Sequence, residues 1–170
     1  MIEVVHLVSV WVHILAACVW IGGMASIALL LVPLLRRERF RAVAEPLLYA
    51  SALRFRWIGW GALLVLIGTG LVNVRMQGIP WAAWGDPSFW GTAWGGALAW
   101  KLGLVGLTLL VSALHDFWLG PRAIALMQEA PESPTTARVR WWSSWMGRIT
   151  LLLSLGILWY AVLLPRGGLP

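Results

Sequence analysis

The chain has 170 residues, of which 60% are hydrophobic and only 12% carry a formal charge. A soluble domain averages about 25% charged residues, so this composition excludes an ordinary soluble enzyme and predicts a single-domain membrane protein. The net charge of +6 does not indicate a nucleic-acid partner, because the basic residues bracket apolar runs. The sequence contains no phosphate-binding loop, dinucleotide fingerprint or CxxC motif, and its single cysteine, Cys18, has no partner for a disulfide within the chain.

The first predicted element is a membrane span over residues 4–35, which include no Lys, Arg, Asp or Glu. No basic residue precedes this run, and it is longer than the apolar part of a signal peptide, so we expect a retained helix. It is also longer than the hydrocarbon core of a bilayer, which is about 30 Å thick. Gly22, Gly23 and Pro33 are the expected positions of a bend.

A basic segment follows, with six arginines between residues 36 and 56, and the positive-inside rule places it in the cytoplasm. Its middle, at residues 40–48, is expected to form a short interfacial helix. The second span is predicted over residues 57–74. Within it, Thr69 and Asn73 are four residues apart and share a helix face on which they can hydrogen-bond to a neighbour.

Residues 75–97 are rich in tryptophan, which favours the membrane–water interface, so this segment is expected on the outer face. The third span is predicted over residues 98–119, ending at Gly120–Pro121. A polar inside loop at 120–140 and a fourth span at 141–164 complete the chain. The predicted fold is all-α: an integral membrane four-helix bundle with both termini outside and both basic loops inside.

Four side chains of the first span fall within roughly 20° of one line on a helix, and they are His6, His13, Trp20 and Met24. Ionisable groups inside a membrane are costly, so the stripe predicts a functional site. His13 is a candidate ligand of copper or haem iron, or a proton-relay group; the alternative is a neutral imidazole hydrogen-bonded to a neighbouring helix. His6, nearer the outer surface, and Met24, a soft thioether that suits copper(I), are further candidate ligands, although packing alone would also explain Met24.

The third span has a polar stripe of its own, because Lys101, Thr108, Ser112 and His115 lie within about 40° of one line. Lys101 is interpreted either as a functional charge that faces the bundle or as a lysine that extends to the headgroups. His115 is a candidate metal or haem ligand. Facing polar stripes on the first and third spans predict that His13 points toward the third span.

Asp116 and Arg148 are predicted to form a structural ion pair at the cytoplasmic end of the third span, because an unpaired charge near lipid is expensive. A haem held by two histidines is disfavoured within one subunit, since His115 lies at the depth of Met24 rather than of His13. A dimer that brings histidines of two subunits together would remove this objection.

Four stretches of the sequence resemble a known family. Residues 53–73 resemble the opening of the copper-resistance protein D (CopD) domain, Phe89–Thr92 and Trp100–Val105 resemble its later segment, and His13–Gly23 looks like the helix that precedes it. A looser similarity exists to the HemJ group of haem-associated membrane proteins, in which His13 and Lys101 would be the functional positions.

The resemblance implies copper handling at the bacterial inner membrane, as transport or delivery between periplasm and cytoplasm. The chain has fewer spans than the larger copper-resistance members and no Met- or His-rich outer segment. Two alternatives therefore stay open: a redox protein that binds haem b, and a non-catalytic accessory or assembly subunit of a respiratory oxidase or reductase. A role outside catalysis is favoured and no catalytic residue is assigned. The expected partners are the lipid bilayer and a second copy or a larger membrane complex.

Overall fold

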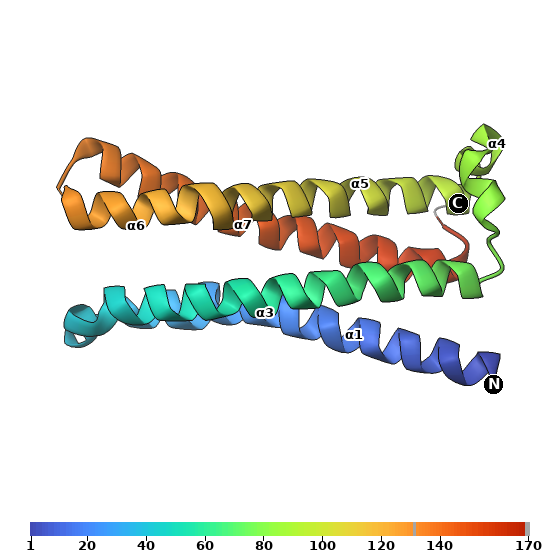
Figure 1. Cartoon of the computed structure of the whole chain (residues 1–170), viewed down its shortest axis with the longest axis horizontal. Helices are drawn as coiled ribbons and strands as arrows, with labels where there is room; N and C mark the ends of the chain where they lie inside the picture. Colours follow the sequence, from blue (N-terminus) through green and yellow to red (C-terminus); the bar gives the residue numbers. More distant parts are fainter. Residues whose placement is uncertain (131, 169–170) are drawn as a thin grey trace. The chain divides into compact units, whose positions relative to one another are not determined.

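The computed structural model describes residues 1–130 and 132–168, apart from the side chain of Glu45, and every regular element in these ranges is helical (Figure 1). Four helical stretches are long and apolar enough to cross a membrane: Ile2–Leu35, Pro46–Met76, Ala93–Glu129 and Pro134–Arg166. The predicted all-α class with four membrane-spanning helices is therefore confirmed, and the chain is a multi-pass membrane protein. Its contacts group into two compact units, Met1–Gly85 and Asp86–Pro170, and each is described by itself.

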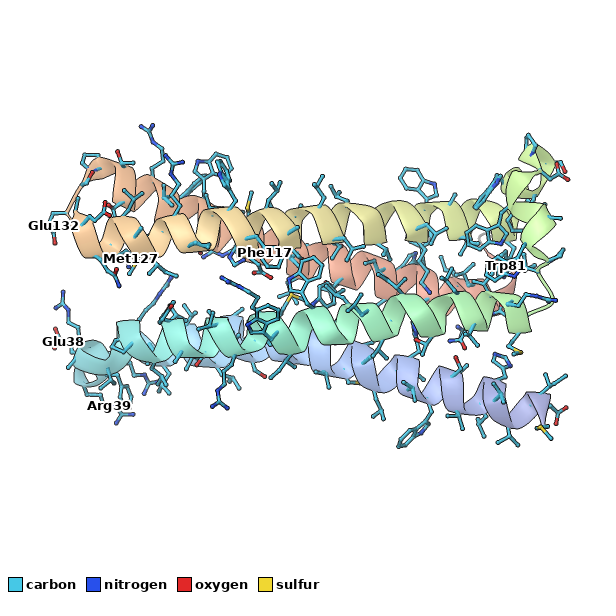
Figure 2. All side chains as sticks on the ribbon, viewed as in Figure 1. Glu38, Arg39, Trp81, Phe117, Met127 and Glu132 are labelled. Atoms are coloured by element: carbon cyan, nitrogen blue, oxygen red, sulfur yellow. The ribbon has the colours of Figure 1, made fainter. Side chains whose placement is uncertain are left out.

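The first unit is a pair of antiparallel helices joined by the basic turn (Figure 1). In chain order its elements are α1 (Ile2–Ser26), the π-helix η1 (Ile27–Leu31), α2 (Val32–Leu35), the 3₁₀-helix η2 (Glu38–Phe40), α3 (Arg41–Met76) and the 3₁₀-helix η3 (Trp81–Gly85). Figure 2 shows Glu38 and Arg39 at the turn that precedes α3. The expected interfacial segment at 40–48 falls at the start of α3 and continues into the second span without a break.

Packing between α1 and α3 depends on glycine at Gly23, and Gly59 lies beside a buried tryptophan at van der Waals distance. A Cβ added at Gly23 would overlap the ring of Phe55, so only glycine allows the two helices their present separation there. At Gly59 the added atom would lie 3.4 Å from Cδ1 of Trp20, whose side chain is buried against α3. The adjacent Gly22 has open space around it, so only Gly23 of this glycine pair sets the helix approach.

The second unit is built on the contact between α5 and α7. Its elements are α4 (Pro87–Trp90), α5 (Ala93–Ala113), the π-helix η4 (Leu114–Leu119), α6 (Gly120–Glu129), α7 (Pro134–Leu163) and the 3₁₀-helix η5 (Leu164–Arg166). Asp86 caps α4 by accepting hydrogen bonds from the Ser88 amide at 2.9 Å and the Ser88 hydroxyl at 2.8 Å. These bonds hold the pKa of the Asp86 carboxyl below its ordinary value.

The third helical stretch does not end at Gly120–Pro121, as the sequence suggested, but runs on to Glu129. Pro121 lies in the first turn of α6, where the missing N–H is tolerated. The described part of the expected loop at 120–140 is therefore mostly helix, and residue 131 lies outside the described residues. The third stretch ends ten residues later than the sequence suggested, because a proline in the first turn of a helix does not stop the helix.

Each π-helix precedes a proline by two residues. η1 ends at Leu31 before Pro33, and η4 ends at Leu119 before Pro121. A proline has no N–H for the carbonyl four residues earlier, and a local widening to i→i−5 pairing absorbs this defect. The widened bond is present at η4, where the Gly120 amide donates to the His115 carbonyl. The expected irregularity near Pro33 is thus a π segment.

Candidate functional site

The first candidate site is centred on His13, in the middle of α1. Its Nδ1 lies 2.7 Å from Oγ1 of Thr69 on α3. The hydroxyl of Ser9, one turn earlier on α1, donates to the backbone carbonyl of Thr69 at 3.5 Å. The imidazole edge packs beside Gly70, where an added Cβ would lie at an ordinary van der Waals distance of 3.5 Å from Cε1 of His13. The stripe on the first span therefore meets the face of the second span that carries Thr69.

The bonds of the Thr69 hydroxyl determine which nitrogen of His13 carries the proton. Oγ1 of Thr69 lies 2.6 Å from the backbone carbonyl of Val65, and a carbonyl can only accept. The single hydroxyl proton is therefore donated to Val65, so Oγ1 must accept from His13. His13 is accordingly the Nδ1–H tautomer, and its lone pair lies on Nε2, the atom with which such a histidine ligates a metal.

The other members of the first stripe lie on the same helix as His13. His6 is half-buried and lies one heptad before it, nearer the chain start. Met24 is half-buried at the far end of α1, and Trp20 between them is buried against Gly59 of α3. On α3, Oδ1 of Asn73 is buried and has no hydrogen-bond partner among the described residues. His6, His13, Trp20 and Met24 therefore all lie on α1, and polar side chains of α3 lie beside His13.

The second candidate site is at His115, inside η4. Nδ1 of His115 lies 2.9 Å from Oδ1 of Asp116, and Nε2 lies 3.2 Å from Oγ of Ser143 on α7. An ionised carboxylate accepts only, so Nδ1–H donates to Asp116. The carboxylate thus orients the ring, and Nε2 faces the hydroxyl of the neighbouring helix. His13 and His115 share one arrangement, in which a polar oxygen holds Nδ1.

The order Ser143, His115, Asp116 repeats the atom order of a serine hydrolase triad. That chemistry also needs N–H donors aimed at a developing oxyanion. Ser143 lies in the interior of α7, where the backbone N–H groups bond along the helix. The backbone N–H groups around Ser143 are therefore engaged in the helix, and the contacts describe an imidazole oriented between a carboxylate and a hydroxyl group.

The polar stripe on α5 lies along its contact with α7. Thr108 and Ser112 are buried, and Oγ1 of Thr108 has no hydrogen-bond partner within the described ranges. Lys101, on the same stripe, is half-buried. On α7, Thr150 and Ser154 are also buried, and the Ser154 hydroxyl donates to the Thr150 carbonyl at 2.6 Å. The second unit therefore has a helix interface lined by small polar groups.

Arg148 stacks on Trp145, with its guanidinium carbon 5.1 Å from the ring centroid. Asp116 lies against His115. The Asp116–Arg148 ion pair stays a prediction, as do the roles of all candidate ligands and the orientation of His13 toward the third span.

The sequence reasoning missed Ser143, although α7 carried a signal that would have found it. Thr136, Ser143, Thr150 and Ser154 fall within about 40° of one line at 100° per residue. All but Ser143 are buried, and Ser143 is half-buried. A stripe of small hydroxyl side chains on the fourth span predicts the face that receives the third span.

No group of three or more His, Cys, Asp or Glu side chains that could hold a metal occurs among the described residues. A closed site for a strongly coordinated ion is thus not preassembled in this part of the chain. Each of the two histidines instead has a hydrogen bond at Nδ1 that sets the orientation of its ring.

Comparison with known proteins places these features in a family. A family model described as copper resistance protein D matches residues 49–164, more than half of the chain's 170 residues. The match begins within α3 and takes in Thr69, Lys101, His115 and Ser143, whereas His13 lies before it.

A relative from Aquifex aeolicus (strain VF5), named only as an uncharacterized protein, is 27% identical over an alignment of length 165 that covers 92% of this chain and 93% of the relative. No solved structure matches significantly. The CopD resemblance seen in the sequence is confirmed, while no match supports the similarity to HemJ. The chain belongs to the copper resistance protein D family.

Proposed function

We propose that this protein handles copper within the membrane, by transport or delivery between periplasm and cytoplasm. The observation that carries the proposal is the matched arrangement of its two intramembrane histidines. In each, a polar oxygen holds Nδ1, at 2.7 Å for His13 and 2.9 Å for His115. This outer hydrogen bond is the usual companion of a histidine that binds a metal through Nε2.

The ligand chemistry fits copper(I) better than a harder ion. Imidazole suits copper, and the thioether of Met24 is a soft ligand that prefers copper(I). Placing a neutral imidazole inside the membrane also costs less free energy than placing a fixed charge there.

In the proposed pathway, His6 and His13 receive copper from the outer side, and Met24 and His115 receive it on the inner side. Lys101 acts as a charge on the route, whose ammonium group opposes the approach of a cation until it loses its proton or moves. The hydroxyl of Ser143 at 3.2 Å from Nε2 of His115 acts as a placeholder that copper displaces.

The proposed location is the bacterial inner membrane, with the arginine-rich turn before α3 and the α6–α7 turn in the cytoplasm and both chain ends outside. Arg36, Arg37, Arg39 and Arg41 support this orientation at the first of these turns. The lipid bilayer is the environment of all four spans. A second copy or a larger membrane complex is the expected protein partner.

Flux measurements in liposomes test this function directly. Purified protein is reconstituted, copper(I) is presented outside under anaerobic conditions, and its arrival at a chelating dye inside is recorded. We expect wild-type protein to admit copper and the His13→Ala variant to lose most of this flux. If wild type binds copper without flux but transfers it to a soluble acceptor, delivery is supported over transport. Wild-type liposomes that show neither flux nor transfer would contradict the proposal.

A further inference from the structure

The second unit contains a cavity of about 380 Å³ between the end of the third helical stretch and the start of α7. Its wall includes Trp118 and Arg122 on one side and Arg138, Trp142 and Met146 on the other. These residues recur at helical spacing, so each helix presents one face to the cavity. The cavity lies outside the histidine sites and has no part in the proposed handling of copper.

The frame of this cavity is fixed by the turn that connects its two helices. Thr136 is fully buried, and its hydroxyl lies 2.7 Å from the Ala130 carbonyl and 3.3 Å from the Leu126 carbonyl at the end of α6. Arg122 lies over the ring of Trp118, with its guanidinium carbon 6.0 Å from the ring centroid. Figure 2 shows Met127 and Glu132 at this end of the unit. The hydrogen bonds of Thr136 thus connect the end of α6 to the start of α7 at this end of the cavity.

All charged side chains that line the cavity are positive. Two guanidinium groups line the cavity, and none of its lining residues is acidic. Among the described side chains, no Asp or Glu forms an ion pair with either Arg122 or Arg138. Planar guanidinium groups bind phosphate oxygens through paired hydrogen bonds, so two of them on facing helices suit a phosphate group.

Apart from Thr135, the rest of the wall is apolar, and its tryptophans are typical of the level of the lipid headgroups. Trp118 and Trp142 face the cavity, and Trp141 and Trp145 flank it on α7. Tryptophans concentrate at the membrane–water interface, and the arginine-rich turns indicate the cytoplasmic side. A ligand that fits must therefore combine an anionic head for the arginines with a hydrocarbon chain for Trp142 and Met146.

We propose that this cavity binds one anionic phospholipid, with its phosphate between Arg122 and Arg138 and its upper acyl chain along Trp142 and Met146. Basic pockets between membrane helices on the cytoplasmic side are known to receive anionic headgroups. A free phosphate ion would leave the apolar wall unused, and a zwitterionic lipid would gain less from the two arginines.

The test is native mass spectrometry of the whole protein, titrated with phosphatidylglycerol or with phosphatidylcholine of the same acyl chains. Wild type should bind one phosphatidylglycerol in preference to phosphatidylcholine, and inorganic phosphate should not displace it. The double variant Arg122→Gln/Arg138→Gln should bind phosphatidylglycerol on the order of tenfold more weakly. The Arg122→Lys/Arg138→Lys variant, which keeps the charge but loses the paired donors, should fall between the two.

The matched control is Arg36→Gln/Arg37→Gln, which removes the same charge from the first unit and should leave phosphatidylglycerol binding unchanged. An equal loss in this control would show that binding depends on overall charge, and the proposal would fail. It would fail as well if wild type did not prefer phosphatidylglycerol, or if inorganic phosphate displaced the lipid, which would indicate a site for the free anion. The proposal would also be overturned if the Gln and Lys double variants at Arg122 and Arg138 both bound phosphatidylglycerol as tightly as wild type.

Discussion

Nδ1 of His13 and Oγ1 of Thr69 lie 2.7 Å apart across the contact between α1 and α3. The Thr69 hydroxyl donates its single proton to the Val65 carbonyl, so Nδ1 of His13 must be the donor in the bond between the two side chains. Thr69 is thus a positioning residue: it sets the tautomer and the ring orientation and leaves the lone pair of His13 on Nε2. Copper capture at His13 should depend on this hydroxyl.

Replacing Thr69 by valine removes the hydroxyl and keeps nearly the same shape. We expect the Thr69→Val variant to bind copper(I) about 10–100-fold more weakly, as is typical when the outer partner of a ligating histidine is lost. Competition against a copper(I) chelator under anaerobic conditions measures this. The Thr69→Ser variant keeps the hydroxyl and should bind like wild type. Equal affinities for all three proteins would mean that Thr69 does not orient a ligand.

The two partners of His115 should have opposite effects on copper binding. Asp116 holds Nδ1, so Asp116→Asn should weaken binding at His115 by about tenfold or more. Ser143 competes for Nε2, so Ser143→Ala should leave binding unchanged or strengthen it. Both are best measured in a His13→Ala background, where the inner site is read alone. A loss of binding in Ser143→Ala would make the serine a ligand partner instead of a placeholder.

The neighbouring glycines Gly22 and Gly23 provide a matched pair for testing the packing of the first unit. A methyl group at Gly23 would overlap the ring of Phe55, whereas Gly22 has open space. We expect Gly23→Ala to lower the free energy of unfolding by about 1–3 kcal/mol, the usual cost of overpacking. Gly22→Ala should have little effect in the same detergent unfolding measurement. Adding Phe55→Leu to Gly23→Ala should restore much of the lost stability, and failure to do so would point away from this contact.

Membrane orientation is tested with introduced thiols in a Cys18→Ser background. The thiol from Arg39→Cys lies in the basic turn and should react with an impermeant maleimide only after the cells are permeabilised. The thiol from Ala82→Cys lies in the exposed tryptophan-rich segment and should react in intact cells. The reverse pattern would place the arginine-rich turn outside and would invert the proposed route.

The sequence alone predicts the four spans, because long apolar runs between basic segments leave few alternatives. It also predicts that the face of α3 with Thr69 bonds to a neighbour, since the helix period puts its polar residues on one side. The helix ends were harder to predict. Pro121 looks like a stop signal, but the wider turns of η4 absorb the missing N–H and the helix continues into α6.

The contact between His115 and Ser143 could not be predicted from the sequence of the third span alone. Asp116 is adjacent in sequence, but Ser143 is 28 residues away on another helix. Ser143 resembles an ordinary exposed serine until the stripe of Thr136, Thr150 and Ser154 is considered with it. Which nitrogen of His13 bears the proton is likewise a property of two hydrogen bonds made by Thr69, and no sequence pattern specifies both.

Metal analysis and an absorption spectrum of the purified protein, compared with the His13→Ala variant, test the central claim most directly. Both proteins are loaded with copper(I) anaerobically and freed of excess metal. We predict that wild type retains copper, that His13→Ala retains clearly less, and that neither shows haem bands. Equal copper in both proteins would contradict the account, and so would a wild-type haem spectrum that disappears in His13→Ala, because His13 would then be a ligand of haem iron.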